Sequence, residues 1–231
     1  MSANTANTPD GRGLLIFNGE VILVYASNVT LTVDKNINEN FNGKYKGSVY
    51  LTSHRIIFMN DAHDQWLHTF EMPFAVMDDV RLEQPIFSAN YLKGYANCLP
   101  GAPIAGQIGW KLSFASGGCI DFGQALLNAV EMAQSLRPAN APPAYAPPSG
   151  NFFAADPGQY APRSGDAFQA PTQTFPGRPD PSNVFINEAP PPYTGIGSER
   201  PPQPTEELVP AGQTITPPSY EESEGLRRRR V

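Results

Sequence analysis

The stretch GSVYLTSHRIIF, from Gly47 to Phe58, decides the fold that we expect. Gly47–Thr52 and Arg55–Met59 are runs rich in β-branched and aromatic residues, and only Ser53 and His54 separate them. Two such runs with a two-residue connection predict an antiparallel hairpin.

Further short runs of the same kind surround this hairpin. They are Val21–Tyr25, Val29–Val33, Trp66–Phe70, Val76–Leu82, Asn90–Tyr95, Trp110–Phe114 and Cys119–Phe122. The last two runs bracket Ser116-Gly117-Gly118, which predicts a second hairpin. Many short strands at near-regular spacing favour a mainly β fold, either an antiparallel sandwich or a partly open barrel.

One helix is expected after the strands, from Gly123 to Leu136, because this segment consists of good helix formers. Its apolar residues recur every three or four positions and give one apolar face: Leu126, Ala129, Val130, Ala133 and Leu136. Pro138 ends the helix. We expect this helix to cap the open end of the sheet.

The composition changes abruptly at Arg137-Pro138, since 20 of the 25 prolines lie from Pro138 onward. A segment with so few aliphatic residues cannot bury enough apolar surface to offset the entropy of ordering it. We therefore expect a flexible N-terminus over residues 1–11, one domain over 12–137 and a disordered tail over 138–231.

Charge and composition exclude several classes of protein. The net charge of −6 divides evenly between residues 1–137 and 138–231, so neither part has the basic excess of a nucleic-acid binder, and direct DNA binding is not expected. The longest early apolar stretch is interrupted and too short to span a bilayer. With no secretory signal and only two cysteines, Cys98 and Cys119, the sequence favours a cytoplasmic and nuclear location.

The tail repeats one tetrapeptide, PPxY, at three of its four tyrosines. The copies are Pro142-Pro143-Ala144-Tyr145, Pro190-Pro191-Pro192-Tyr193 and Pro217-Pro218-Ser219-Tyr220. Composition alone would place two prolines before roughly one tyrosine in twenty. The repetition therefore indicates a ligand that the chain offers several times.

Proline pre-extends the backbone, so a Pro-Pro pair loses little entropy on docking. One polyproline II turn later, the tyrosine returns to the face of the first proline, where its ring can enter a neighbouring pocket. WW and SH3 domains bind such segments in aromatic grooves, and the lack of basic residues close to the proline pairs favours WW domains. The alternative is a proline-rich spacer whose tyrosines bind nothing.

Three blocks of the sequence resemble the WW domain-binding protein 2 family. They are GSVYLTSHRIIF (Gly47–Phe58), QPIFSANYLKG (Gln84–Gly94) and WKLSFASGGCIDFGQ (Trp110–Gln124). The resemblance implies a GRAM domain, a relative of the pleckstrin-homology (PH) fold, followed by a tail with PPxY motifs. This tail departs from the family pattern by being sparser and by ending in Arg227-Arg228-Arg229-Arg230.

For function, the resemblance implies an adaptor and transcriptional coregulator. Its partners would be WW-domain proteins, including growth-control coactivators and HECT-type ubiquitin ligases. A sperm-head factor in egg activation is an alternative within the same family. A phosphoinositide-recruited membrane scaffold is another, since GRAM and PH-like modules can bind these lipids through basic residues, and Lys44, Lys46 and Arg55 are the candidates.

Two further expectations concern regulation and chemistry. Tyr193 and Tyr220 are candidate phosphorylation sites, because a phosphate would add charge and bulk to a ring that must enter a pocket. We expect no enzyme, no cofactor and no metal, since the sequence contains no catalytic motif and His54, His63 and His68 fit no zinc spacing.

Overall fold

The computed structural model describes residues 1–34, 43–98, 106–135, 151–162, 168–193 and 195–196. In chain order, the strands of these residues are β1 (Ser2–Ala3), β2 (Leu14–Phe17), β3 (Ile22–Val33), β4 (Lys44–Thr52), β5 (Arg55–Asn60), β6 (Thr69–Pro73), β7 (Met77–Glu83), β8 (Tyr91–Asn97), β9 (Gln107–Phe114), β10 (Phe152–Ala154) and β11 (Val184–Asn187). The helices are α1 (Cys119–Ser135) and three 3₁₀ turns, η1 (Phe74–Val76), η2 (Pro157–Gln159) and η3 (Pro181–Asn183).

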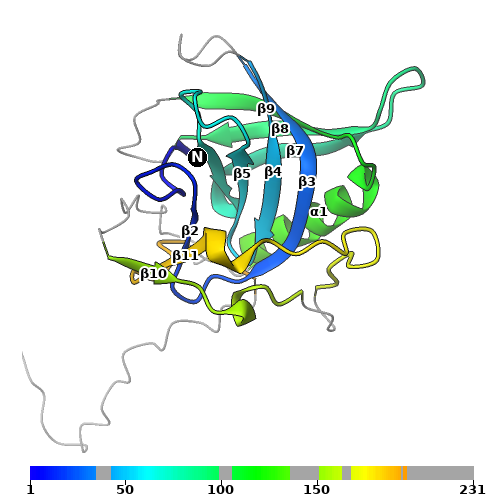
Figure 1. The fold of residues 1–231 in the computed structure, drawn as a ribbon. Coiled ribbons are helices and arrows are strands. Elements are labelled where there is room, and N and C mark those ends of the chain that lie inside the picture. Colours follow the sequence, from blue (N-terminus) through cyan, green and yellow to red (C-terminus); the bar gives the residue numbers. More distant parts are fainter. Residues whose placement is uncertain (35–42, 99–105, 136–150, 163–167, 194, 197–231) are drawn as a thin grey trace, which may run out of the picture. The chain divides into compact units, whose positions relative to one another are not determined.

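Eight strands form one antiparallel sheet in the order β1-β6-β5-β4-β3-β9-β8-β7 (Figure 1). The predicted hairpin is confirmed, because β4 and β5 pair on either side of Ser53 and His54. The runs at 21–25 and 29–33 are parts of one strand, β3, which bends at a bulge between Ala26 and Val29. Past the bulge β3 pairs with both β4 and β9, so it joins the two halves of the sheet.

The helix α1 begins at Cys119, four residues before the predicted start, and the prediction of a second hairpin is wrong. Gly117 and Gly118 both have positive φ, +83° and +81°, and they turn the chain out of β9 into the helix. The amide of Phe122 donates to the carbonyl of Gly118 at 2.9 Å, so Cys119–Phe122 is the first turn of α1 and not a strand.

The predicted apolar face of α1 is buried at Leu126, Ala129, Val130 and Ala133, whereas Leu136 lies outside the described residues. This face packs against η1, β7 and β8 and closes one end of the sheet, as expected. The main core beneath it contains buried aromatic rings from strands of both halves and from the helix, among them Phe58, Trp110 and Phe122. The fold is therefore mainly β with one capping helix.

The first residues are ordered against the domain, which differs from the flexible N-terminus that we expected. Ser2 and Ala3 form β1 and pair with Glu71 and Phe70 of β6. Met1 is fully buried in the main core. The sequence offered no long apolar run here, and two residues of backbone pairing with one buried side chain suffice to order the segment.

Part of the predicted disordered tail also belongs to the fold. Strands β10, β11 and β2 form a second, three-stranded sheet in which β11 runs parallel to β2 (Figure 1). Phe175 packs against Phe114 and Phe122, with ring centroids 6.2 and 5.9 Å away. The average composition of the tail conceals these widely spaced apolar residues, and proline-rich backbone between them loses little entropy on ordering.

Removal of the whole tail should therefore weaken the domain. A chain of residues 1–137 exposes the apolar surface that Val184 and Ile186 cover on Leu14 and Ile16. Each buried aliphatic side chain contributes about 1.5–3 kcal/mol before ordering costs. We expect a loss of a few kcal/mol in the free energy of unfolding, measured by chemical denaturation, whereas a chain of residues 1–197 should match the full chain. Equal midpoints for all three chains would contradict the ordered tail.

Candidate functional site

The middle PPxY motif lies on the domain, which differs from the exposed ligand that we expected. Tyr193 is only 9% exposed, Pro191 and Pro192 are half-buried, and Pro190 is exposed. The other two motifs, Pro142-Pro143 with Tyr145 and Pro217-Pro218 with Tyr220, lie outside the described residues. The candidate site is therefore the place where the domain holds Tyr193.

The chain reaches this place through β11. Val184, Phe185, Ile186 and Asn187 pair in register with Leu14, Leu15, Ile16 and Phe17 of β2. Val184 and Ile186 are buried with Leu14 and Ile16 in a second core cluster. Beyond β11, the amide of Asn18 donates to the carbonyl of Ala189 at 3.1 Å, so backbone pairing continues almost to the first proline of the motif.

A second anchor lies just beyond the motif. The amide of Ile196 donates to the carbonyl of Ser53 at 2.7 Å, and the Ile196 side chain is 3% exposed within the main core. Gly195 passes so close to the β4–β5 turn that a Cβ atom there would lie 2.5 Å from the Ser53 carbonyl oxygen. The motif is thus held on the domain from both ends.

The side chain of Tyr193 lies against the rings of Phe17 and His54, and we call this place the tyrosine pocket. The Phe17 ring lies 6.0 Å away at 88°, an edge-to-face arrangement, and the His54 ring lies 6.3 Å away. The Tyr193 hydroxyl is buried and has no hydrogen-bond partner within the described part of the chain. Burial raises the pKa of this phenol, while Arg55 lowers it and Glu20 raises it, so the group stays neutral.

The Phe17 ring lies against a buried charge cluster around Arg55. Its guanidinium binds the carboxylate of Glu20 in a bidentate manner, with Nε at 2.9 Å and Nη2 at 2.8 Å, and also pairs with Glu71. The same guanidinium lies 4.5 Å from the centre of the Phe17 ring. Arg55 therefore supports the aromatic wall that Tyr193 contacts.

Arg55 was a predicted lipid contact, and that prediction is wrong. Its side chain is 2% exposed, and both partner carboxylates are buried as well. A buried guanidinium is stable only when it is paired and hydrogen-bonded, and here its donors reach Glu20, Glu71 and the carbonyl of Leu15. The residue organises the interior and offers nothing to a membrane surface.

Surrounding groups complete the hydrogen bonds of the two carboxylates. Glu20 accepts from the Thr52 hydroxyl at 2.6 Å and from the Phe17 amide at 2.9 Å. Glu71 accepts from the hydroxyls of Thr5, at 2.8 Å, and Ser2. Burial alone would raise the pKa of Glu20, but the charge and hydrogen bonds of Arg55 outweigh it and hold that pKa below its usual value.

His54 is the second ring that Tyr193 contacts. Its Nδ1 lies 2.7 Å from the hydroxyl of Ser53. Burial lowers the pKa of this imidazole, an effect that Glu20 opposes and Arg55 reinforces. The ring is therefore neutral at pH 7 and presents an uncharged face to Tyr193. The other two histidines, His63 and His68, do not join it, and the described residues contain no cluster of three or more potential metal ligands.

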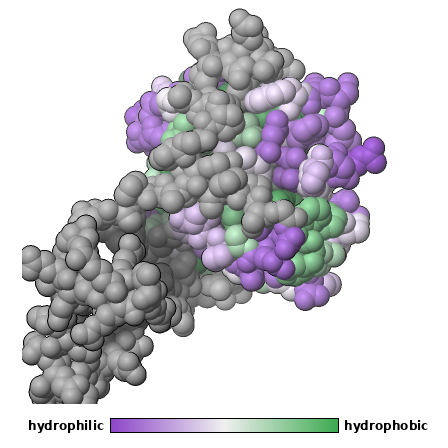
Figure 2. Space-filling model, turned by 90° about the vertical axis from the view of Figure 1, so that its left-hand side faces the viewer, coloured by the Kyte–Doolittle hydropathy of each residue, from purple (hydrophilic) through white to green (hydrophobic). Residues whose placement is uncertain are grey.

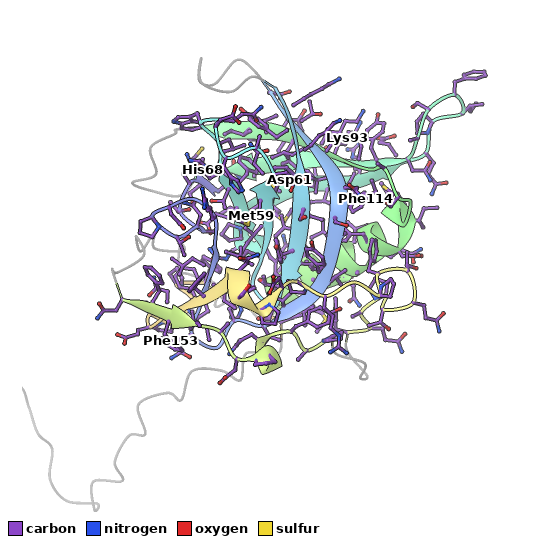
Figure 3. The ribbon with its side chains drawn as sticks, viewed as in Figure 1. Met59, Asp61, His68, Lys93, Phe114 and Phe153 are labelled. Carbon is purple, nitrogen blue, oxygen red and sulfur yellow. The ribbon has the colours of Figure 1, made fainter. Side chains whose placement is uncertain are left out.

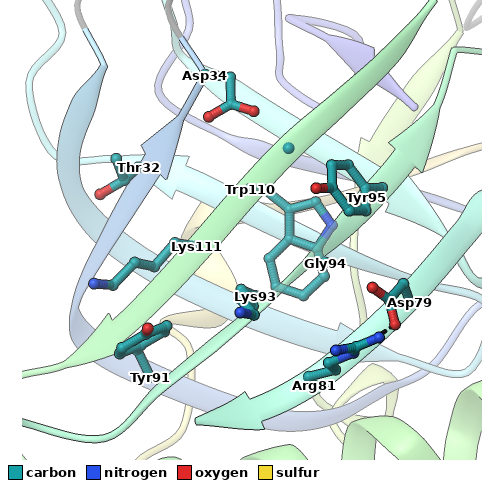
Figure 4. A pocket seen from close by; sticks show the side chains of 11 residues that line it. Thr32, Asp34, Asp79, Arg81, Tyr91, Lys93, Gly94, Tyr95, Trp110 and Lys111 are labelled. Carbon is teal, nitrogen blue, oxygen red and sulfur yellow. Dashed lines mark hydrogen bonds and ion pairs between the residues drawn. The ribbon is translucent and has the colours of Figure 1, made fainter. Parts of the chain in front are cut away.

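The two predicted lipid contacts that remain, Lys44 and Lys46, are exposed on the same face of β4. A groove of about 440 Å³ lies along β7, β8 and β9 and reaches Thr32, the strand partner of Lys44 (Figure 4). It is lined by Thr32, Asp34, Asp79, Arg81, Tyr91, Lys93, Gly94, Tyr95, Gly109, Trp110 and Lys111. Its cations already have partners. Arg81 pairs with Asp79 at 2.6 Å, Lys93 pairs with Glu83 at 2.7 Å, and the Lys111 amine lies 3.7 Å from the Tyr91 ring centre.

Apolar surface remains near the second sheet. Phe152 and Phe153 of β10 are 39% and 49% exposed, and Phe153 projects from the lower left of the molecule in Figure 3. Figure 2 views the molecule from the left-hand side of Figure 1 and shows hydrophobic residues next to hydrophilic ones on that face. Among the described helices, none is long and apolar enough to cross a membrane.

Sequence reasoning missed Phe17, Glu20, Glu71 and Ile196, which hold the motif or build its pocket. The sequence did contain one signal of this charge cluster. Glu20 is the only charged residue within the apolar stretch Leu14–Tyr25, and Arg55 is the first residue of another apolar run. Isolated charges of opposite sign in apolar strands indicate a buried ion pair.

Residues 18–132 match the family model of the GRAM domain. Together with the antiparallel sheet and its capping helix, this match defines the class of the protein: it is a GRAM-domain protein with a PH-like fold. The Vps36 N-terminal PH domain is a structural neighbour at a TM-score of 0.44 and 19% identity, covering 58% of this chain and 96% of that one.

The sequence relatives narrow the class to a family. WW domain-binding protein 2 of Homo sapiens is 40% identical over 129 residues, which cover 55% of this chain and 49% of that protein. Postacrosomal sheath WW domain-binding protein of Bos taurus is 34% identical over 198 residues, 84% of this chain and 60% of that protein. The chain belongs to the WW domain-binding protein 2 family, and its matches span about half the length of the curated relatives.

The charge cluster makes a direct prediction about stability. Replacement of Arg55 by Met leaves Glu20 and Glu71 buried without their cation, which should cost about 3–5 kcal/mol of unfolding free energy. The matched control is Arg81→Met, which removes an exposed ion pair and should cost less than about 1 kcal/mol. Chemical denaturation measures both, and similar costs for the two variants would contradict the structural role of Arg55.

Proposed function

We propose that this chain is a non-enzymatic adaptor that binds WW-domain proteins through its three PPxY motifs. The observation that carries the proposal is the repetition itself: three of the four tail tyrosines follow a Pro-Pro pair at the same spacing. Each pair is pre-extended for an aromatic groove, and each tyrosine supplies a ring for a neighbouring pocket. Two relatives of the family carry WW domain binding in their names, which supports the same proposal.

The contacts fall on the prolines and tyrosine of each motif. They are Pro142, Pro143 and Tyr145, then Pro190, Pro191 and Tyr193, then Pro217, Pro218 and Tyr220. The partners that fit are tandem-WW coactivators and HECT-type ubiquitin ligases, with a role in transcriptional coregulation in the cytoplasm and nucleus. A single motif buries little surface and binds weakly, so a partner with two WW domains gains from the high effective concentration of the second motif.

Avidity predicts how variants behave against a tandem-WW partner. Single replacements Tyr145→Ala or Tyr220→Ala should weaken binding moderately, and replacement of all three tyrosines should reduce affinity by a factor of about 100 or more, because linked sites gain this much over one. Calorimetric titration measures the affinities.

The control for the middle motif uses its prolines. Pro190 is exposed and Pro191 is half-buried, so Pro190→Ala with Pro191→Ala disables that ligand while the Tyr193 ring stays in the domain. Combined with Tyr145→Ala and Tyr220→Ala, this variant should lose binding as fully as the triple tyrosine variant. Undiminished affinity in either combination refutes the adaptor proposal.

Phosphorylation should oppose WW binding. A phosphate on Tyr193 or Tyr220 adds nearly two negative charges to a ring that must enter an apolar pocket. Phosphorylated peptides of residues 186–197 and 213–224 should therefore bind a WW domain at least about tenfold more weakly than their unmodified forms. Fluorescence anisotropy compares the two forms, and equal affinities would exclude a phosphotyrosine switch.

A further inference from the structure

The three PPxY motifs are not equivalent, because the domain itself binds the middle one. Its tyrosine ring is 9% exposed and contacts Phe17 and His54, and its hydroxyl is enclosed. Strand β11 precedes the motif, and the buried Ile196 lies beyond it. The domain thus makes the same kind of contact that a WW domain would make, an aromatic wall against the tyrosine of an extended segment.

The two modes of binding exclude each other. A WW domain must accept the Tyr193 ring in its own pocket, and the ring cannot occupy two pockets at once. The anchors leave little freedom nearby, since the Asn18 amide binds the carbonyl of Ala189 and the Ile196 amide binds that of Ser53. Only Pro190 of the motif is exposed, so a WW domain cannot surround the motif while it is docked.

We propose that the domain is an intramolecular binding partner of the middle motif, which it holds through Val184–Tyr193 and through Gly195 and Ile196, and that the tyrosine pocket competes with WW domains for Tyr193. The motif is masked while the segment is docked and becomes a WW ligand when the segment is released. The proposal rests on the proposed function, because it assigns regulation to one of the three motifs. The chain then offers two motifs, at Tyr145 and Tyr220, under conditions in which the third is withheld.

Gly195 allows the docked state to be weakened without any change to the tetrapeptide. An alanine Cβ there would lie 2.5 Å from both the Ser53 carbonyl oxygen and Cδ2 of His54, which no ordinary contact permits. The φ of Gly195 is not in the left-handed region, so alanine adopts the same backbone in a released segment. The matched control is Gly158→Ala, because a Cβ at Gly158 meets no atom within 4 Å.

The experiment uses the full chain with Tyr145→Ala and Tyr220→Ala, so that the middle motif is the one intact PPxY motif and the measured affinity is its own. A single isolated WW domain is titrated into this chain, into its Gly195→Ala and Gly158→Ala forms, and into peptides of residues 184–200 with and without Gly195→Ala. We expect Gly195→Ala to tighten binding of the full chain about tenfold or more, since the apparent affinity scales with the released fraction. Gly158→Ala should change nothing, and the two peptides should bind alike and more tightly than the parent chain.

Equal affinities of the parent chain, its Gly195→Ala form and the peptide would overturn the competition. If the peptides fail to bind the WW domain, the proposed function fails at this motif and the competition fails with it. In that case, hydrogen exchange of the Ile196 amide measures docking independently, and Gly195→Ala should accelerate this exchange about tenfold or more. A second variant, Ile196→Ser, removes the apolar anchor downstream of the tetrapeptide and should act in the same direction, whereas unchanged exchange in both variants would contradict docking itself.

Discussion

The guanidinium of Arg55 is buried, and the surrounding residues pair its charge with two buried carboxylates. Glu20 arrives from the turn before β3 and Glu71 from the middle of β6, so the pairing of one cation with two carboxylates fixes how three separate segments meet. The Phe17 ring lies against the guanidinium, and Tyr193 lies against that ring. The docking of the middle motif therefore depends on a charge cluster that the motif does not touch with a hydrogen bond.

Much of the fold was predictable because alternating apolar residues report strand faces directly. The β4–β5 hairpin and the apolar face of α1 are where the sequence places them. The start of α1 was not predictable from local signals, since Ser116-Gly117-Gly118 suits a hairpin and a strand-to-helix turn equally well. Packing decides which element comes after such a turn, and here Phe122 belongs in a core cluster with Phe114 and Phe175.

The candidate site was predictable in part. Repetition of a rigid tetrapeptide predicts a ligand whether or not the copies are exposed, so the three motifs could be found from sequence. The docking of one of them could not, because its anchors, Val184, Ile186 and Ile196, are scattered among prolines that dominate the average composition. For Arg55 the error was the reverse, because a buried residue was predicted to be exposed. A basic residue beside a turn suggested a surface contact, and its two acidic partners could not be recognised because they are distant in sequence.

In the proposed competition, Tyr193 has two alternative binding partners, the domain and a WW domain, and the balance between them decides how many motifs the chain presents. Nuclear magnetic resonance of the full chain tests this most directly through cross-relaxation between the ring protons of Tyr193 and Phe17. The account predicts strong cross-peaks between the two rings in the free chain and their disappearance when a WW domain is added in excess. Tyr193 resonances at unstructured-peptide positions in the free chain, with no cross-peak to Phe17, would contradict it.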